Sequence, residues 1–313
     1  MPPIEASRAN AYTGNRLDRA ATRRDDAAWV AAALADPASL FVPLWRTRNL
    51  LRGFAEESPQ AALLDAAQAA PVMPAAAGWA LLGIEPDPAG QAERAIFALD
   101  LGAADDPPPL PPETGAFADL RAAAGLLPRH DAALLAYARG LIHWRRRHRF
   151  CGLCGAACAP ESAGHVMRCT GCGTSHFPRT DPAVIMLVTD GEHALLGHSQ
   201  RFPNTALYST LAGFVEPGES LEEAVAREVM EEAGIATGAV RYHSSQPWPF
   251  PASIMLGFYA QALTRQIAVN PHELRDARWF SRAELRDPAA SGFSLPGHDS
   301  IARRLIEDWI ASP

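Results

Sequence analysis

Residues 213–235, with the sequence GFVEPGESLEEAVAREVMEEAGI, constrain the fold of this chain more than any other stretch. Ser220 is a favourable helix N-cap, and Glu223 three residues later is typical of a capping box. Gly234 is typical of the residue that ends a helix. The stretch therefore predicts a helix over about 221–233, preceded by a loop that turns tightly.

Three glutamates, Glu228, Glu231 and Glu232, fall on the last turns of this expected helix. Like charges three or four residues apart destabilise a helix by roughly a few tenths of a kcal/mol per pair, and a bound divalent cation would reverse that effect. Carboxylates suit hard cations, and Mg²⁺ is typically held by one or two of them together with substrate phosphate oxygens. Gly213 and Gly218 let the preceding loop approach a diphosphate closely. The alternative is an acidic helix end that is merely solvated.

The composition excludes some classes of protein. The chain has 313 residues, of which 48% are hydrophobic and 20% charged, which predicts one or two globular domains plus a small module. The formal net charge of −7 gives no general basic character that would favour nucleic acid. The start, MPPIEASRAN, lacks the pattern of a signal peptide, and the longest apolar stretch, near 75–84, is too short for a bilayer. We therefore expect a soluble cytoplasmic protein with no membrane partner.

All five cysteines lie in one short segment, and four of them follow the pattern C-x2-C-x14-C-x2-C: Cys151, Cys154, Cys169 and Cys172. Four thiolates at this spacing are typical of a zinc ribbon, in which two knuckles close a tetrahedral site. Four protein ligands leave no open position for water, so one structural Zn²⁺ per chain is expected. The alternative is four unligated thiols. Cys158 is left over, either as a simple thiol or as a spare ligand.

The sequence pattern of residues 1–149 predicts a small α+β domain. Its strands are expected near 40–46, 49–53, 78–83 and 95–99, and its helices near 25–36, 117–124 and 132–148. Irregular segments are expected at 10–26 and 107–112, and a turn at 85–90.

The last helix of this domain ends in a basic run, WRRRHR, at 144–149. A solvated basic face near a helix C-terminus suits the helix dipole. The alternative is a contact with phosphate or RNA.

The remainder divides into the ribbon at 150–177 and a larger domain at 178–313. Apolar runs predict strands at 183–189, 193–198, 239–246, 254–260 and 277–281, and helical patterns add helices at 281–285 and 300–310 to the one described above. Asp190 and Gly191 are typical of a hairpin turn between the first two strands. Strands on both sides of a helix favour a mixed sheet between helices, so the chain is expected to be α+β.

The order of motifs resembles one enzyme family. Residues 213–235 fit the Nudix box, G-x5-E-x7-R-E-U-x-E-E-x-G-U, where U is a bulky aliphatic residue. The ribbon and HFPR at 176–179 precede the box, and SQPWPFP at 245–251 follows it. This combination resembles the NADH pyrophosphatase family of Nudix hydrolases, clearly over 117–310 and loosely over 1–100.

The resemblance implies a Nudix α/β/α sandwich with a mixed sheet, preceded by a zinc ribbon and the small α+β domain. It implies Mg²⁺- or Mn²⁺-dependent hydrolysis of the pyrophosphate of NADH or NAD⁺, giving reduced or oxidised nicotinamide mononucleotide and AMP. It also implies removal of NAD caps from RNA 5′ ends. A homodimer is expected, with an active site shared between the subunits.

The resemblance also assigns roles to acidic residues. Glu228, Glu231 and Glu232 are expected to ligate metal and activate water, without a decision on which is the base. The ligands of Mg²⁺ or Mn²⁺ are expected to be Glu228, Glu232, Glu273 and the backbone carbonyl of Ala212. Arg227 is expected to pair with Glu219 and hold the loop.

The residues expected to contact substrate come from several segments. Phe214 should stack on a base, and Phe177 should stack from the partner subunit. Arg121 matches a substrate arginine if one residue is inserted before the ribbon. Some relatives place a glutamate where Gly164 stands, so that contact is absent here or made by Glu161. The remaining expected contacts are Gln246, Pro247, Trp248, Pro249, Phe250, Pro251, Ala252, Ser253 and Ala302.

Three other functions stay open from the sequence. RNA decapping could be the main role with free NADH incidental, or another nucleoside diphosphate derivative could be the main substrate. The chain could also be a nucleic-acid-binding protein with a zinc ribbon and an inactive Nudix domain. The complete set of carboxylates in the box favours an enzyme.

Overall fold

The computed structural model describes residues 3–54, 58–86, 93–103, 105–123, 125–203 and 206–312. The chain forms two compact units. The first contains Met1–Ala11, Asp181–Trp248 and Ser253–Pro313, and the second contains Tyr12–Thr180 and Pro249–Ala252. Most of the turn expected at 85–90, and the end of the helix expected at 117–124, lie outside the described residues.

The first unit is built on a six-stranded mixed sheet with the order β14-β15-β11-β12-β16, to which β13 adds by pairing with β11. The pairing of β11 with β15 is parallel, and the other pairings are antiparallel. The strands are β11 (Asp181–Thr189), β12 (His193–Ser199), β13 (Leu211–Phe214), β14 (Thr237–Trp248), β15 (Ser253–Ala262) and β16 (Leu274–Ser281).

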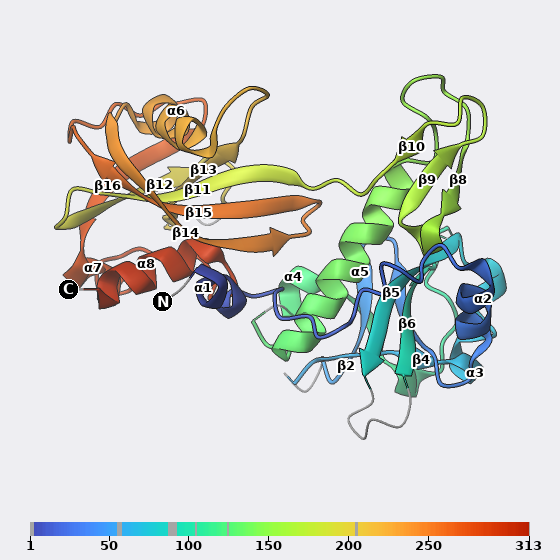
Figure 1. Cartoon of the computed structure of the whole chain (residues 1–313). Helices are drawn as coiled ribbons and strands as arrows, with labels where there is room; N and C mark the ends of the chain where they lie inside the picture. The colour runs from blue at the N-terminus through green and yellow to red at the C-terminus, as the bar shows by residue number, and fades with distance from the viewer. Residues whose placement is uncertain are drawn as a thin grey trace. The chain divides into compact units, whose positions relative to one another are not determined.

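Helices cover both faces of this sheet, as Figure 1 shows. The helices are α1 (Pro3–Ala9), α6 (Leu221–Ala233), α7 (Arg282–Arg286) and α8 (Ile301–Ala311). Val225 and Val229 of α6 pack with Val184 and Phe258 on one face. Side chains of α8 pack on the other face with β11 and β12. The arrangement confirms the expected α/β/α sandwich.

The second unit holds a seven-stranded sheet with the order β3-β2-β1-β6-β5, in which β4 pairs with β1 and β7 with β2. Its strands are β1 (Leu40–Trp45), β2 (Arg48–Arg52), β3 (Gln60–Ala61), β4 (Leu64–Asp65), β5 (Gly78–Pro86), β6 (Glu93–Asp100) and β7 (Ala116–Asp119). Its helices are α2 (Ala27–Ala35), α3 (Ala66–Ala69), η1 (Met73–Ala75), η2 (Pro112–Thr114), α4 (Leu120–Ala123) and α5 (Arg129–Arg147).

The ribbon follows α5 in the same unit (Figure 1). It is a three-stranded antiparallel sheet with the order β10-β9-β8. Its elements are β8 (Cys158–Glu161), η3 (Ser162–Gly164), β9 (Val166–Cys169) and β10 (Ser175–His176).

One local expectation was wrong, and one helix had no prediction. The helix expected at 117–124 is instead the strand β7 followed by the single-turn helix α4, because β7 pairs with the edge of β2. The N-terminal helix α1 was not expected. It packs on β14, where the Ser7 hydroxyl accepts from the Ser245 amide and the Asn10 amide donates to the Ser245 carbonyl.

Among the described residues, no helix combines the length and the apolar character that a bilayer crossing needs.

Candidate active site and zinc centre

The helix expected at 221–233 is α6, and its ends are those that the sequence indicates. The Ser220 hydroxyl accepts from the Glu223 amide, and the Glu223 carboxylate accepts from the Ser220 amide at 2.8 Å. Gly234 ends the helix with a left-handed backbone, φ 68°. These local caps fix where the glutamates of α6 point.

Gly213 on β13 lies directly against Glu228. A Cβ atom at this position would lie 1.8 Å from Glu228 Oε1, well inside contact distance. The glycine therefore lets the carboxylate pack on the strand backbone, which holds it beside the sheet.

Three carboxylates converge next to this contact. One oxygen from each of Glu228, Glu232 and Glu273 lies within 4.8 Å of the other two. Glu228 and Glu232 project from α6 and are 8% and 6% exposed, whereas Glu273 precedes β16 and is exposed. The Asn270 amide donates to the Glu232 carbonyl, which ties the loop of Glu273 to the helix.

The carboxylates of this group repel one another when they are ionised. Burial, and next the charges of Glu228 and Glu273, raise the pKa of Glu232 to about 8. Burial also raises the pKa of Glu228, and Glu231 and Glu273 add to the rise, although Arg227 opposes it. Burial and mutual repulsion disfavour the ionised form of these carboxylates. A bound hard cation would stabilise that form. The donor set fits a hard divalent cation, because Glu228, Glu232 and Glu273 bring three carboxylates together.

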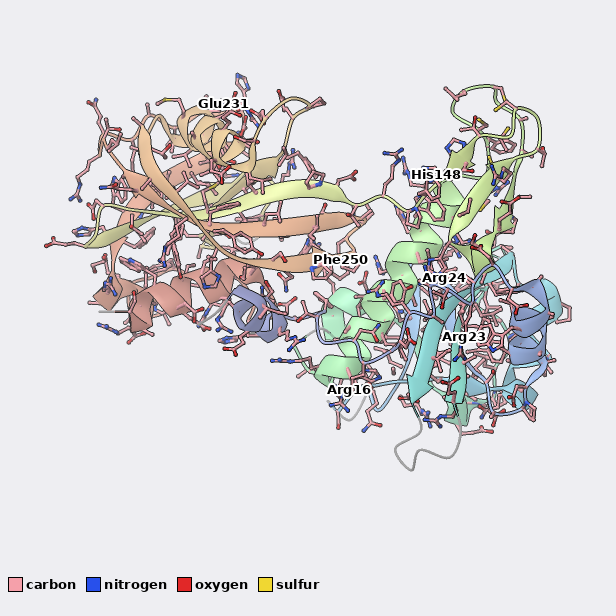
Figure 2. The ribbon with its side chains drawn as sticks, in the orientation of Figure 1. Arg16, Arg23, Arg24, His148, Glu231 and Phe250 are labelled. Carbon is pink, nitrogen blue, oxygen red and sulfur yellow. The ribbon has the colours of Figure 1, made fainter. Side chains whose placement is uncertain are left out.

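Glu231, which is labelled on α6 in Figure 2, is not a member of this group of three. Its carboxylate pairs with the Arg227 guanidinium at 2.9 Å. Arg227 also pairs with Glu219 at 2.6 Å and donates to the Phe214 carbonyl, which confirms the expected pairing of Arg227 with Glu219. The guanidinium thus joins the loop to the helix, and a role of Glu231 in catalysis stays a prediction.

Ala212 precedes Gly213 on β13 and pairs with Ile185 of β11. A backbone hydrogen bond from Ala212 to the Glu232 carboxylate lowers the pKa of that group and opposes the effect of burial. Ala212 therefore lies at the acidic group, and metal binding by its carbonyl stays a prediction.

The two aromatic residues expected to stack on bases are both available at the surface. Phe214, at the end of β13, and Phe177, after β10, are each 58% exposed. They belong to different units, the first and the second respectively. Exposed aromatic faces of this kind can stack on bases, at about 1–3 kcal/mol each.

Gln246 is buried, and its side chain makes hydrogen bonds to the backbone of other residues. Its amide donates to the carbonyls of Ala11 and Asp299, at 3.2 and 2.7 Å, and its oxygen accepts from the Ile301 amide at 2.8 Å. These bonds fix the start of α8. Ser253 and Ala302 are buried as well. Gln246 therefore positions backbone. Direct contact with substrate stays a prediction for Gln246, Ser253 and Ala302.

The segment after β14 belongs to the second unit, and Phe250 anchors it there (Figure 2). The guanidinium carbons of Arg121 and Arg139 each lie 5.0 Å from the Phe250 ring centroid, and Tyr12 meets the ring edge-on. Arg139 Nε also donates to the Pro249 carbonyl at 2.9 Å. Arg121 is therefore close to the expected substrate segment.

Arg139 was missed from the sequence. It lies on the buried side of α5, and burial lowers its pKa. An arginine within a largely apolar helix face was the available signal.

The remaining expected contacts follow the same segment. Pro247 and Trp248 end β14 in the first unit, whereas Pro249, Pro251 and Ala252 belong to the second.

The four ribbon cysteines form a compact group. Their sulfurs lie within 4.8 Å of one another, with Cys151 and Cys172 3.7 Å apart and Cys154 and Cys169 3.4 Å apart. A tetrahedral zinc with Zn–S bonds of about 2.3 Å places its sulfurs about 3.8 Å apart. The group therefore fits Zn²⁺.

Hydrogen bonds within the ribbon favour the thiolate form of two of these cysteines, which is the form that binds metal. The amides of Gly171 and Cys172 donate to Cys169 Sγ, and such bonds lower the pKa of Cys169. Hydrogen bonds from Thr174 lower the pKa of Cys172 to about 6. Cys158 lies outside the group of four and is opposite Cys169 in the pairing of β8 with β9.

The basic run at the end of α5 is not a fully solvated face, so that expectation was wrong for two of its arginines. Arg145 donates to the Trp79 carbonyl, and Arg146 pairs with Asp100. Arg147 and Arg149 are exposed.

Three family models match consecutive parts of the chain. The NADH pyrophosphatase-like rudimentary NUDIX domain matches residues 38–144, the NADH pyrophosphatase zinc ribbon domain matches 146–177, and the NUDIX domain matches 179–302.

Two curated relatives show the extent of the similarity. The NAD-capped RNA hydrolase NudC of Stutzerimonas stutzeri (strain A1501) is 48% identical over 178 residues, which are 57% of this chain and 62% of that protein. The NAD-capped RNA hydrolase NUDT12 of Homo sapiens is 41% identical over 198 residues, which are 59% of this chain and 43% of that protein. The chain thus spans less than two thirds of the length of either relative. Since the three matching domains follow one another in a single order, the chain belongs to the NADH pyrophosphatase family of Nudix proteins.

Proposed function

We propose that this protein is a metal-dependent hydrolase of the pyrophosphate bond of NADH and NAD⁺, releasing AMP and reduced or oxidised nicotinamide mononucleotide. The observation that carries the proposal is the convergence of Glu228, Glu232 and Glu273 beside Gly213. A diphosphate is doubly negative, so an acidic site binds it only through cations. Mg²⁺ or Mn²⁺ at this group supplies charge neutralisation on the phosphate oxygens and lowers the pKa of a bound water.

The side chains of this protein then have three tasks. Glu228, Glu232 and Glu273 hold the acidic site together, and one carboxylate of Glu228, Glu231 or Glu232 accepts the proton of the attacking water. The water oxygen bonds to one phosphorus as the bridging P–O bond breaks, and the bridging oxygen leaves on the other mononucleotide. Arg227 supports this arrangement through its pairs with Glu219, Glu228 and Glu231.

The nucleoside parts are proposed to bind through aromatic faces and the segment at 246–253. Phe214 offers an exposed ring one residue after Gly213. Phe177 would supply a second ring from the partner subunit of a homodimer. Arg121, stacked on Phe250, is proposed to contact the anionic substrate.

RNA with a 5′ NAD cap is proposed as a second substrate of the same site. The two relatives described above are both named NAD-capped RNA hydrolases. The scissile pyrophosphate is the same in the cap and in free NAD⁺, so one set of carboxylates serves both. We also place the enzyme in the cytoplasm, because a ribbon of zinc-binding thiolates needs a reducing compartment.

Glu228→Gln tests the proposal. It removes one charge from the acidic group at nearly constant volume, so release of AMP from NADH should fall by about a hundredfold or more, as expected when a group that stabilises transition-state charge is lost. NAD-cap removal from RNA should fall in parallel. Glu222→Gln, on the exposed face of the same helix, is the matched control and should retain activity.

Two results would contradict the proposal. Wild-type protein that releases no AMP with Mg²⁺ or Mn²⁺ would favour a binding protein with an inactive Nudix domain. Release of ADP-ribose and free nicotinamide would mean that the glycosidic bond, not the pyrophosphate, is cleaved.

A further inference from the structure

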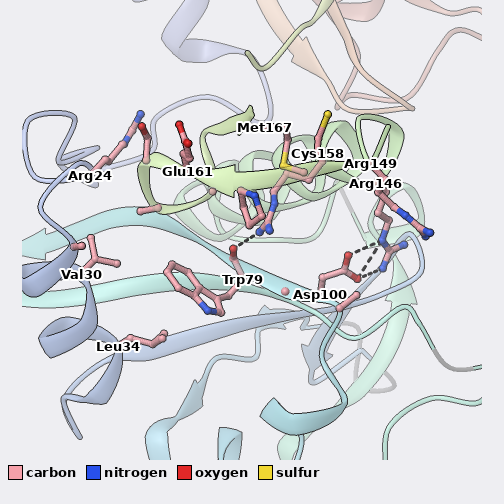
Figure 3. A pocket seen from close by; sticks show the side chains of 18 of the residues that line it. Arg24, Val30, Leu34, Trp79, Asp100, Arg146, Arg149, Cys158, Glu161 and Met167 are labelled. Atoms are coloured by element: carbon pink, nitrogen blue, oxygen red, sulfur yellow. Dashed lines mark hydrogen bonds and ion pairs between the residues drawn. The ribbon is translucent and has the colours of Figure 1, made fainter. Parts of the chain in front are cut away.

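A large cavity lies in the unit that does not contain the acidic group. Its volume is about 1010 Å³, and its walls come from α2, the start of β5, the end of β6, the end of α5 and the ribbon (Figure 3). All of its lining residues belong to the second unit. This volume is at the upper end of the range of small-molecule sites.

One wall of this cavity is apolar and the other is basic. Val30, Leu34 and the ring of Trp79 form the apolar wall in Figure 3. Arg145 and Arg149 line the basic end. A ligand that fills the cavity therefore needs an apolar, ring-sized body and an anionic group.

The carboxylates of the lining are already engaged. Asp100 pairs with Arg146, and Glu161 pairs with Arg168 outside the cavity. Asp25 accepts a hydrogen bond from the Ser162 hydroxyl. Each of these carboxylates therefore has a partner other than Arg145 and Arg149.

Arg145 and Arg149 are in the opposite situation. Among the described residues, neither takes part in an ion pair with a carboxylate, and Arg145 Nε has no hydrogen-bond partner. The Arg145 guanidinium donates to the Trp79 carbonyl, a neutral acceptor, and burial lowers its pKa more than the charge of Asp100 raises it. A half-buried guanidinium that no carboxylate pairs with is costly, and an anionic ligand would lower that cost.

Two glycines make room for the guanidinium groups. A Cβ atom at Gly78, where φ is +147°, would lie 3.0 Å from an Arg145 nitrogen. A Cβ atom at Gly102 would lie 1.8 Å from an Arg146 nitrogen. Close packing on bare backbone holds these flexible side chains in place, as a preformed anion site requires.

We propose that this cavity binds a nucleoside monophosphate, with its phosphate between Arg145 and Arg149 and its base against Trp79 and Leu34. A phosphomonoester carries nearly two negative charges at neutral pH, which match the two guanidinium groups at the basic end of the cavity, Arg145 and Arg149. Guanidinium groups bind phosphate oxygens through two parallel hydrogen bonds. They bind a neutral sugar more weakly. The proposal does not rest on the proposed hydrolase activity, because it concerns a different unit of the chain.

The first experiment locates the binding of AMP on zinc-loaded full-length protein by methyl NMR without added Mg²⁺ or Mn²⁺. AMP is also a product of the proposed reaction, so binding alone is not sufficient. Val30, Leu34 and Met167 report on the cavity, whereas Val215 and Leu221 report on the region of the acidic group. Shifts at the first set support the proposal, and shifts confined to the second set overturn it.

The second experiment compares variants by calorimetric titration of AMP. Arg145→Gln should weaken binding at the cavity tenfold or more, because charge-assisted bonds to phosphate are lost. Arg147→Gln is the matched control, since Arg147 is exposed on the same helix and does not line the cavity. Adenosine should bind at least tenfold more weakly than AMP.

A third variant guards against a folding defect in Arg145→Gln. Ala31→Trp keeps every arginine and fills the cavity from an exposed position of α2. It should abolish the shifts at Leu34 and Met167 while leaving the thermal stability of the protein unchanged. Equal affinity of AMP for wild type, Arg145→Gln and Ala31→Trp would overturn the proposal.

Discussion

At the scale of single residues, the acidic site depends on one glycine. Glu228 packs so closely on the backbone of Gly213 that no side chain fits between them. Conformational freedom is not the issue here, because the backbone of Gly213 is not in the left-handed region. The requirement is space for a carboxylate.

Gly213→Ala should displace Glu228 and weaken binding of Mn²⁺ tenfold or more. The added methyl would lie 1.8 Å from Oε1, so the side chain must rotate away from Glu232 and Glu273. Titration of Mn²⁺ followed by electron paramagnetic resonance measures the loss without any assay of activity. Gly125→Ala is the control, because nothing lies within 4 Å of a Cβ at that position. Unchanged Mn²⁺ affinity in Gly213→Ala would remove this account of the glycine.

Glu232 should make the stability of the metal-free site depend on pH. Burial and the neighbouring carboxylates raise its pKa from the ordinary 4.5 to about 8. Between these values the folded protein binds more protons than the unfolded chain, so the free energy of unfolding falls as the pH rises. The contribution of Glu232 is fully present below pH 4.5 and lost as the pH passes 8.

Glu232→Gln should flatten this dependence, since its side chain stays neutral throughout. In buffer freed of Mg²⁺ and Mn²⁺, with zinc still bound, the wild-type melting temperature should fall a few degrees further than that of the variant between pH 5 and pH 8. Glu222→Gln, exposed on the same helix, should follow the wild type. Parallel curves for wild type and Glu232→Gln would show that this carboxyl is not perturbed.

At the scale of elements, α6 is defined by signals within its own sequence. Ser220→Ala removes the hydroxyl that accepts from the Glu223 amide. The loss should cost about 1 kcal/mol of unfolding free energy, measured by urea denaturation of the first unit. Ser220→Thr keeps a capping oxygen and should stay close to the wild type, and an equal loss in both variants would argue against the cap.

Elements with such local signals could be predicted from the sequence. The bounds of α6 follow from a capping box and a glycine, and Ser281 and Ser300 likewise cap α7 and α8. The strand β7 could not be predicted, because its pairing with β2 is a contact between segments far apart in the chain. Pairing partners of this kind override local helix preference.

The same distinction holds for the site. Glu228 and Glu232 share a face of one helix, so spacing alone brings them together. Glu273 joins them through the fold, and only the family resemblance indicated it. The contact of Gly213 with Glu228 has no local signature, and the sequence gives no sign that Arg139 packs on Phe250, because each contact joins segments that are separated along the chain.

At the scale of the whole molecule, the ribbon and the N-terminal sheet form a single unit. His165 Nε2 lies 2.7 Å from the Leu81 carbonyl, and burial lowers the pKa of His165 to about 4, so the imidazole is neutral. Gly164 fits against Ala80, where a Cβ atom would lie 2.7 Å from that side chain. The fold of the ribbon therefore supports the sheet that it covers, and with it the cavity described above.

Cys169→Ser should remove zinc and destabilise the second unit as a whole. Metal analysis should give about one zinc per chain for the wild type and far less for the variant. Structural zinc contributes directly to folding, so the transition of the second unit should fall by roughly 10 °C or more. The first unit keeps its own core and should unfold as before, which differential scanning calorimetry can resolve.

Cys158→Ser is the matched control, because Cys158 lies in the same ribbon but outside the group of four sulfurs. If Cys158→Ser lost zinc as well, or Cys169→Ser kept it, the four-cysteine site would be wrong. If zinc were lost without a change in the second unit, the coupling through His165 and Gly164 would be wrong instead.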